Sequence, residues 1–254
     1  MTSEIDESRA PLLDHLLELR KRLLLSMAAL AVAFGGCLYF ARPIFSFLVQ
    51  PLLRAGQRKL IYTQLFDAFF VEIKVAFFAA MMLAFPVIAN QLWQFVAPGL
   101  YRNEKRALLP FLLATPVLFL TGASLAYFVA IPLALHFLLG FQGNMGGIQQ
   151  EALPAVGNYL SFVMQFLFGF GLAFLLPILL MLLERAGIVT RKQLIGARRY
   201  AIVGAFAIAA VLTPPDIGSQ LLLALPLIVL YEMALIGIWF TERKRASSEP
   251  SEPA

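Results

Sequence analysis

Charged residues are scarce in this chain, and cysteine is nearly absent. Asp, Glu, Lys and Arg make up 14% of the 254 residues, whereas they make up about 25% of an average soluble domain. This scarcity excludes an ordinary soluble protein. Cys37 is the single cysteine, which excludes an internal disulfide or a cysteine metal cluster and makes redox chemistry unexpected.

Motifs that support enzymatic chemistry are also missing. The sequence has no G-x-x-x-x-G-K-[ST] phosphate loop, no H-E-x-x-H zinc motif and no G-x-S-x-G nucleophile elbow. We therefore expect no enzyme, no cofactor and no nucleotide site. Any work that the protein performs then needs another source of energy.

The sequence has long apolar runs instead. Hydrophobic residues make up 60% of the chain, and the mean hydropathy is +0.80. Runs of roughly 20 apolar residues match a helix that crosses a hydrocarbon core of about 30 Å. We predict an all-α integral membrane protein with one membrane domain, residues 1–245, and a disordered polar tail, 246–254. Its six transmembrane helices are expected at about 23–41, 71–96, 108–139, 158–183, 200–212 and 217–240.

The basic residues predict the orientation of these helices. Fifteen of the 20 Lys and Arg residues lie in the N-terminal tail, near residue 102, at 185–199 and at 243–245, all on one predicted side. By the positive-inside rule both termini are cytoplasmic. Topology and anionic lipid then explain the net charge of +5, and membrane rather than nucleic acid is the expected partner. His15 and His136 fall on opposite faces, so they are not expected to share a metal.

Prolines and run lengths predict a concave bundle of kinked helices. The spans are interrupted by prolines at positions 86, 116, 132, 177 and 226, so several helices should bend. The run 200–212 has 13 residues and covers about 20 Å, so spans five and six are expected to be short. Between the first two spans, PIFSFLVQPLL and LIYTQLFDAFF predict interfacial helices that cap the outer face.

Two acidic residues stand where bases are expected. Glu18 lies in HLLELRKRL before the first span, and Glu104 lies in APGLYRNEKR after the second. One interpretation is local, because a helical Glu18 can pair with Lys21 and Arg22 three and four residues later. The alternative is a cytoplasmic site in which both carboxylates bind a cationic peptide. Arginine suits such a site because its planar fork binds a carboxylate in a bidentate manner, which lysine cannot do.

A few polar residues lie within or near the later spans. Glu232 in VLYEMALIG is either a functional intramembrane acid or a structural group that reaches water near the helix end. Gln165 in FVMQFLFG is expected to link helices by hydrogen bonds. Asp216 in TPPD can cap the helix that follows. Gln220, one helical turn later, faces either a partner helix or the outer interface.

Five motifs follow one another in order between residues 10 and 240: HLLELRKRL, QLWQFVAPGLYRNEKR, AYFVAIPLALHF, NYLSFV and VGAFAIAAVLTPPDIGSQLLLALPL. Together they resemble the TatC family, the polytopic subunits of the twin-arginine protein translocase. The resemblance implies a receptor in the bacterial cytoplasmic (inner) membrane that binds twin-arginine signal peptides of folded proteins at the cytoplasmic face. It also implies a hetero-oligomer of several TatC copies with the single-span subunits TatA and TatB, and export driven by the proton-motive force.

The resemblance implies roles for residues near the cytoplasmic face. Glu18 and Glu104 match the carboxylates that contact the paired arginines of the signal peptide. Arg20 matches the arginine of the same N-terminal motif. Phe95 lies in the motif that flanks the site, where its ring, beside Trp93, is expected to supply apolar surface.

Further matches lie elsewhere in the chain. Pro51 matches a functionally sensitive proline of the first outer loop. Asp216 and Gln220 lie at the outer turn of the two spans that family members offer to partner helices. In several relatives a glutamate precedes the proline of the fourth span, but Leu175 stands at that position here, with Gln165 as a candidate polar substitute.

Two other functions stay open on the residues alone. A small-solute secondary transporter would use Glu232 as a proton relay, so its uptake activity in liposomes would disappear in Glu232→Gln. A scaffold would use its acids only to pair with neighbouring bases, so charge swaps that restore the pairs would leave its function intact.

Overall fold

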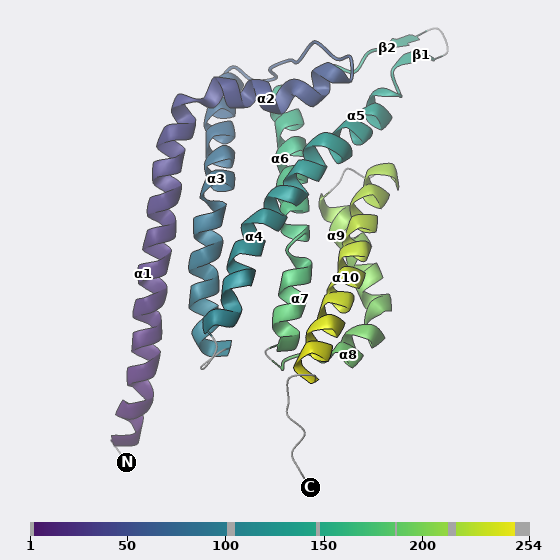
Figure 1. Ribbon diagram of the computed structural model, residues 1–254. Coiled ribbons are helices and arrows are strands. Elements are labelled where there is room, and N and C mark those ends of the chain that lie inside the picture. Colours follow the sequence, from purple (N-terminus) through teal and green to yellow (C-terminus); the bar gives the residue numbers. More distant parts are fainter. Residues whose placement is uncertain (1–2, 101–104, 146–147, 186, 213–216, 247–254) are drawn as a thin grey trace. The chain divides into compact units, whose positions relative to one another are not determined.

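The computed structural model describes the backbone of residues 3–100, 105–145, 148–185, 187–212 and 217–246, and the side chains of 16–95, 112–143, 151–185, 187–211 and 217–243. These residues are almost entirely helical (Figure 1). In chain order the elements are α1 (Ser3–Tyr39), α2 (Ala41–Arg54), α3 (Asp67–Leu100), α4 (Lys105–Leu125), the π-helical turn η1 (Ala126–Ala130), α5 (Ile131–Leu139), β1 (Gly143–Met145), β2 (Ile148–Gln150), α6 (Val156–Ala173), α7 (Leu176–Arg185), α8 (Arg191–Gly196), α9 (Arg198–Leu212) and α10 (Ile217–Ala246).

Among the described residues, five helical segments are long and apolar enough to cross a membrane. They are Leu16–Tyr39, Asp67–Phe95, Leu112–Leu139, Val156–Arg185 and Ile217–Arg243. They overlap the predicted spans one, two, three, four and six, and the chain is a multi-pass membrane protein. The sixth span lies in α10, which has 30 residues, so the expectation that this span is short is wrong. The predicted fifth span corresponds to α9, whose 15 residues reach about 22 Å at 1.5 Å per residue. The count of six spans and their orientation therefore stay predictions.

The chain divides into two units by its internal contacts. The first comprises Met1–Phe47 and Ala68–Pro116, and the second comprises Leu48–Asp67 and Val117–Ala254. The first unit is built around α1 and α3, and the second around η1 and the helices from α5 to α10.

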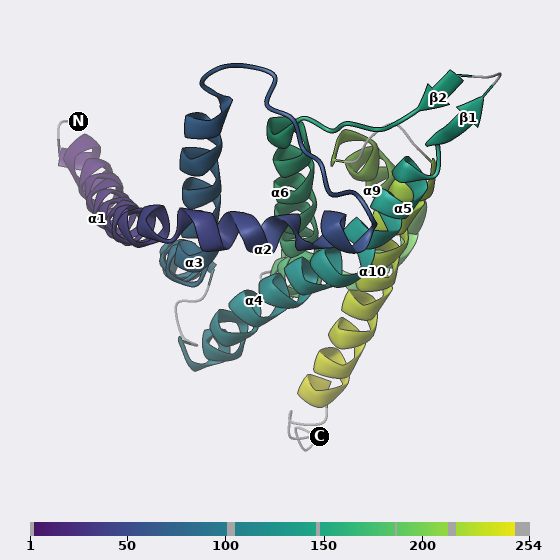
Figure 2. The same cartoon turned by 90° about the horizontal axis from the view of Figure 1, so that it is seen from above.

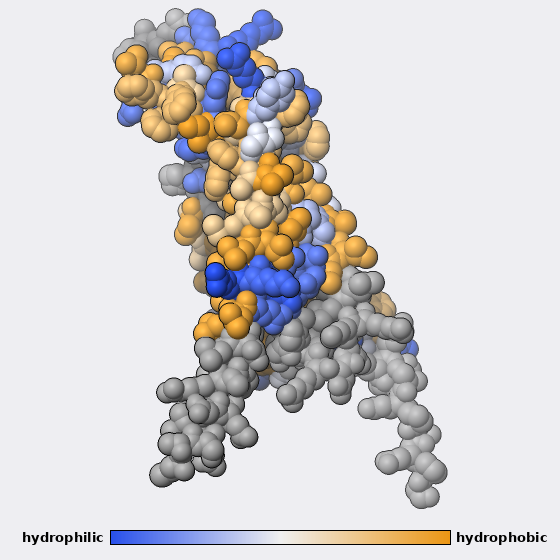
Figure 3. Space-filling view, turned by 90° about the vertical axis from the view of Figure 1, so that its left-hand side faces the viewer, coloured by the Kyte–Doolittle hydropathy of each residue, from blue (hydrophilic) through white to orange (hydrophobic). Residues whose placement is uncertain are grey.

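In the first unit, α1 and α3 lie side by side and run in opposite directions (Figures 1 and 2). Small residues pack where the helices meet: Cys37 of α1 and Ala41, the first residue of α2, are buried in one cluster with Ala76 and Ala80 of α3. Small side chains let two membrane helices approach closely. Only 6% of the most apolar window of α1 is buried in the chain, and Figure 3 shows its broad apolar surface with a hydrophilic band near one end. The outer surface of α1 is therefore suited to lipid or to another chain.

The second unit has a close crossing of α4 and α6. Gly122 of α4 lies against the backbone of Phe170 and the ring of Phe174, and Gly171 of α6 lies against the ring of Phe119. A Cβ atom on either glycine would come within 3.0 Å of these neighbours. Both glycines and the Phe119 side chain are buried. The crossing thus depends on two residues that have no side chain.

Two of the five span prolines alter the helical hydrogen bonding. Pro177 lies near the start of α7, and α6 ends four residues before it at Ala173. The proline ring would clash with the carbonyl of that residue in a continuous helix. Pro132 follows η1, where π-helical turns replace the regular pattern. The predicted irregularities are confirmed at these two sites, whereas the prolines at 86, 116 and 226 lie inside continuous helices.

The segment between α1 and α3 matches its prediction only in its first half. PIFSFLVQPLL is helical and forms most of α2, but LIYTQLF forms a loop, so the prediction of a second interfacial helix there is wrong. The loop backbone pairs instead with the chain before α6: Ile61 N donates to Pro154 O at 3.2 Å, and Val156 N donates to Ile61 O at 2.9 Å. Helix α3 then begins at Asp67, whose Oδ2 accepts hydrogen bonds from Gln64 N and from both Thr63 N and Oγ1.

A short antiparallel hairpin, β1 with β2, pairs Gly143 with Gln150 and Met145 with Ile148. Strands of three residues are too short to show an alternating pattern, and the all-α prediction did not include them. The tail predicted at 246–254 lies outside the described residues except for Ala246.

Candidate functional site

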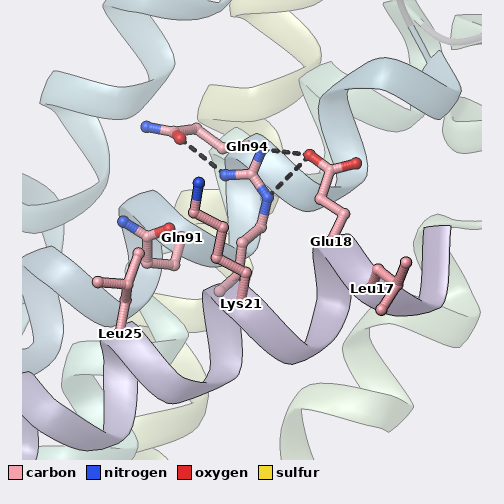
Figure 4. Close-up of a pocket in the computed structure, with 7 residues that line it drawn as sticks. Leu17, Glu18, Lys21, Leu25, Gln91 and Gln94 are labelled. Carbon is pink, nitrogen blue, oxygen red and sulfur yellow. Dashed lines mark hydrogen bonds and ion pairs between the residues drawn. The ribbon is translucent and has the colours of Figure 1, made fainter. Parts of the chain in front are cut away.

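An open pocket of about 480 Å³ lies between α1 and α3 in the first unit (Figure 4). Its volume is within the range of about 300–1,000 Å³ typical of ligand sites. It combines aliphatic side chains with charged groups and amides, and it is lined by Leu17, Glu18, Lys21, Arg22, Leu25, Gln91 and Gln94.

Helical periodicity brings these side chains together. On α1, Leu17, Lys21 and Leu25 are spaced four residues apart, as are Glu18 and Arg22, so they share one broad face. On α3, Gln91 and Gln94 are three residues apart and also share a face. The charged residues of α1 stand at the start of its apolar segment, and the two glutamines stand at the end of the apolar segment of α3. The antiparallel packing of the two helices places these polar ends beside each other.

One guanidinium group connects the two helices across the pocket. Arg22 Nε donates to Glu18 Oε1 at 3.0 Å, and Arg22 Nη2 donates to the same oxygen. Arg22 Nη1 donates to Gln94 Oε1 at 2.7 Å, and Gln94 Nε2 in turn donates to Asn90 Oδ1 at 2.9 Å. The ion pair between Glu18 and Arg22 predicted from their spacing is therefore confirmed. The Glu18 side chain is 35% exposed and that of Arg22 19%, so the carboxylate stays accessible to a ligand.

The other residues predicted for this site are placed differently. Arg20 is exposed on α1 and does not line the pocket, and its position two residues after Glu18 turns it about 200° around the helix from that residue. Phe95 is half-buried and follows Gln94, but it does not line the pocket. Glu104 lies outside the described residues. A site that uses Glu18 and Glu104 together therefore stays a prediction.

Of the polar residues at this pocket, sequence reasoning assigned only Glu18 to a binding site and treated Lys21 like Arg22. It assigned Arg22 to topology and to a local ion pair, and it did not single out Gln91 or Gln94. The available signal was the pair of glutamines in QLWQ at the end of an apolar run, because residues three apart share a helix face. Their contact with α1 depends on tertiary packing, which the spacing alone does not give.

Pro51, predicted as an outer-loop functional residue, is buried within α2. The same helix is held to α6 by a hydrogen bond from Tyr159 Oη to Leu48 O at 2.9 Å. Within the second unit, this bond fixes the backbone three residues before Pro51. The proline therefore occupies a packed position in its helix.

The residues predicted for partner contacts lie near the connection of α9 and α10. Gln220 Nε2 donates to Phe206 O at 3.3 Å, so this side chain joins α10 to α9 within the chain. Asp216 lies outside the described residues. The use of this surface by partner helices stays a prediction.

Glu232 and Gln165, the two predicted polar residues of the spans, have different surroundings. Glu232 Oε2 accepts a hydrogen bond from Arg198 Nη2 at 2.8 Å, and both side chains are about half exposed. This ion pair favours the interpretation of Glu232 as a structural residue. Gln165 is exposed on α6, and Leu175 is half-buried at the break between α6 and α7.

The family model for the Sec-independent protein translocase protein (TatC) matches residues 14–226 of this sequence. The chain belongs to the TatC family. It is 48% identical to the Sec-independent protein translocase protein TatC of Magnetococcus marinus, with 98% of this chain and 91% of the relative covered. It is 39% identical to the TatC protein of Escherichia coli, with 92% and 89% covered.

A solved structure agrees with this family assignment. The crystal structure of the twin arginine translocase receptor TatC in DDM has a TM-score of 0.78 and 41% sequence identity, and the match covers 87% of this chain and 98% of the other. Membership of the TatC family makes this chain a component of protein transport rather than a catalytic enzyme. It also disfavours the small-solute transporter that the sequence alone left open.

Proposed function

We propose that this protein is the receptor and core subunit of a twin-arginine translocase. It binds the twin-arginine signal peptides of folded proteins at the cytoplasmic face of the bacterial inner membrane. Glu18 and Glu104 contact the paired arginines, and Phe95 contributes to the apolar flank of the site. The positive-inside rule supports cytoplasmic termini and therefore a cytoplasmic position of the start of α1.

One observation carries the proposal, namely the carboxylate of Glu18 in an open pocket at the end of an apolar helix pair. Glu18 already binds a guanidinium group there, because Arg22 donates two hydrogen bonds to it. Aliphatic side chains of Leu17 and Leu25 line the same pocket. A peptide with arginines next to apolar residues matches both parts of this lining, since guanidinium pairs with carboxylate and apolar side chains gain from burial.

The same family assignment supports a proposal about assembly. We propose that the chain forms a hetero-oligomer of several copies with TatA and TatB, and that the proton-motive force drives export. The surface of α9 and α10 around Gln220 and Asp216 receives the partner helices. The many exposed apolar side chains of these helices, among them Val203, Val211, Leu225 and Val229, support a contact with lipid or with other membrane helices.

The test measures binding of a twin-arginine peptide to the purified protein in nanodiscs, together with photocrosslinking from position 18 or 104. We expect Glu18→Gln and Glu104→Gln each to weaken binding by about tenfold, because a hydrogen bond to a charged group contributes about 1.5 kcal/mol at the lower end of its range. A peptide with two lysines should bind the unchanged protein weakly, since lysine lacks the planar fork.

Glu72→Gln is the matched control. Glu72 is an exposed acid on α3 that pairs with Arg42 at 3.6 Å, away from the pocket. We expect it to leave binding unchanged. Equal binding by the unchanged protein, both single variants and the double variant would refute the assigned site.

A further inference from the structure

The carboxylate proposed to bind a signal-peptide arginine is occupied by an arginine of its own chain. Arg22 bonds to both Glu18 and Gln94, which are labelled among the pocket residues in Figure 4. Its Nε and Nη2 both bond to Glu18 Oε1, and its Nη1 bonds to Gln94 Oε1 at 2.7 Å. Three donors of one guanidinium thus contact two side chains that line the pocket.

This arrangement uses the same chemistry as the proposed ligand. A peptide arginine and Arg22 carry identical guanidinium groups, and both need the carboxylate of Glu18 as acceptor. Arg22 shares a helix face with Glu18, four residues away, so it is always present at high local concentration. A ligand arginine that takes its place must break the existing ion pair.

We propose that Arg22 is an internal competitor for the peptide site, which lowers the affinity for twin-arginine peptides and promotes their release. This inference rests on the proposed function, because it requires that the peptide contacts Glu18. When the ligand arrives, Arg22 moves off the carboxylate and keeps Gln94 as an acceptor. When the ligand leaves, Arg22 returns to Glu18. Binding is therefore an exchange of one guanidinium for another.

The size of the effect follows from the partial exposure of the pair, whose side chains are 35% and 19% exposed. Ion pairs at the protein surface have interaction energies that correspond to equilibrium constants of about 1.4 to 5 for formation of the pair. The apparent affinity of a ligand equals its intrinsic affinity multiplied by the fraction of receptor in which the site is available. Competition by Arg22 then weakens peptide binding by about two- to sixfold. An effect of this size adjusts release without abolishing recognition.

Four variants test the competition by measured dissociation constants for twin-arginine and twin-lysine peptides in nanodiscs. Arg22→Met keeps an apolar stem and removes the guanidinium, so we expect both peptides to bind about two- to sixfold more tightly. Arg22→Lys keeps the positive charge but loses the planar fork, so we expect a smaller gain of the same sign. Arg42→Met makes the same change at an exposed ion pair outside the pocket and should leave binding unchanged. Glu18→Gln should weaken binding of the twin-arginine peptide.

The Arg22→Lys result separates competition from simple charge. If Arg22 acted only by repelling a cationic peptide, Arg22→Lys would bind as the unchanged protein does, and the proposal would be overturned. Weaker binding by Arg22→Met would also overturn it, because it would make Arg22 a part of the peptide contact. Unchanged binding by both Arg22 variants, with weaker binding by Glu18→Gln, overturns the competition and leaves the proposed function standing. Unchanged binding by Glu18→Gln overturns both.

Discussion

The crossing of α4 and α6 gives a quantitative prediction. Replacing glycine by alanine should destabilise the protein at Gly122 in the crossing and stabilise it at Gly36 on α1. In Gly122→Ala, the new Cβ would lie 2.8 Å from Phe174 Cγ and closer still to the carbonyl oxygen of Phe170. A backbone carbonyl cannot rotate away as a side chain does. Overpacking of a core costs about 1–3 kcal/mol, and this rigid contact belongs at the upper end. Replacing glycine by alanine within a helix raises the free energy of unfolding by about 1 kcal/mol.

The net change for Gly122→Ala is therefore a loss of about 2 kcal/mol in the free energy of unfolding. At about 2–4 °C per kcal/mol, the midpoint of thermal unfolding in detergent should fall by about 4–8 °C. Gly36→Ala on α1 is the matched control, because nothing lies within 4 Å of its Cβ position. Its midpoint should rise by about 2–4 °C. Equal midpoints for the two variants would refute the close crossing.

Gly171→Ala extends the test to a contact that can be relieved. Its Cβ would lie 2.5 Å from Phe119 Cε2, which is a side-chain atom. Phe119→Leu removes the ring, so the double variant should be more stable than the sum of the two single effects predicts. A double-mutant cycle measures this coupling. Purely additive effects would contradict the contact between Gly171 and the ring.

Two further contacts give predictions of their own. Tyr159→Phe removes the buried hydrogen bond to Leu48 O and should lower the free energy of unfolding by about 1 kcal/mol, and with it the thermal midpoint. Tyr39→Phe, at an 85% exposed residue, is the control and should leave the thermal midpoint unchanged. Equal midpoint shifts for the two variants would contradict the bond to Leu48. Glu232→Arg places two like charges together at Arg198 and should lower the thermal midpoint slightly, because half-exposed pairs contribute less than about 1 kcal/mol. Adding Arg198→Glu should restore the midpoint, and a failure to restore it would show that the pair is not the cause.

The helical fold could be predicted in large part because membrane helices leave a strong local signal. Runs of apolar residues predicted six spans, and five of them coincide with long apolar helices. A chain segment in lipid must be helical because its backbone groups have to be bonded within the segment. The loop at LIYTQLF could not be predicted in this way. Its apolar composition resembled that of α2, but backbone hydrogen bonds between Ile61 and the chain before α6 hold it in another conformation. Such pairing joins residues more than 90 positions apart and has no local pattern.

The charged pair of the candidate site could be predicted from the sequence, but the other residues that line the pocket could not. The spacing of Glu18 and Arg22 on one helix was enough to predict their ion pair, because four residues make about one helical turn. Gln94 entered the site only through the packing of α3 against α1. Arg20, which the family resemblance placed with Glu18, lies on another side of the same helix, because residues two apart do not face each other.

The sequence by itself determined that this protein lies in a membrane, where its long apolar helices are and which family it resembles, because hydropathy and ordered motifs are properties of local stretches. Only the tertiary structure decided that Arg22 joins Glu18 to Gln94, that Gly122 and Gly171 permit a close helix crossing, and that Gln220 bonds to α9. These contacts depend on which faces of distant helices meet. Helical periodicity defines the faces of each helix, but packing against a neighbour selects the one that is used.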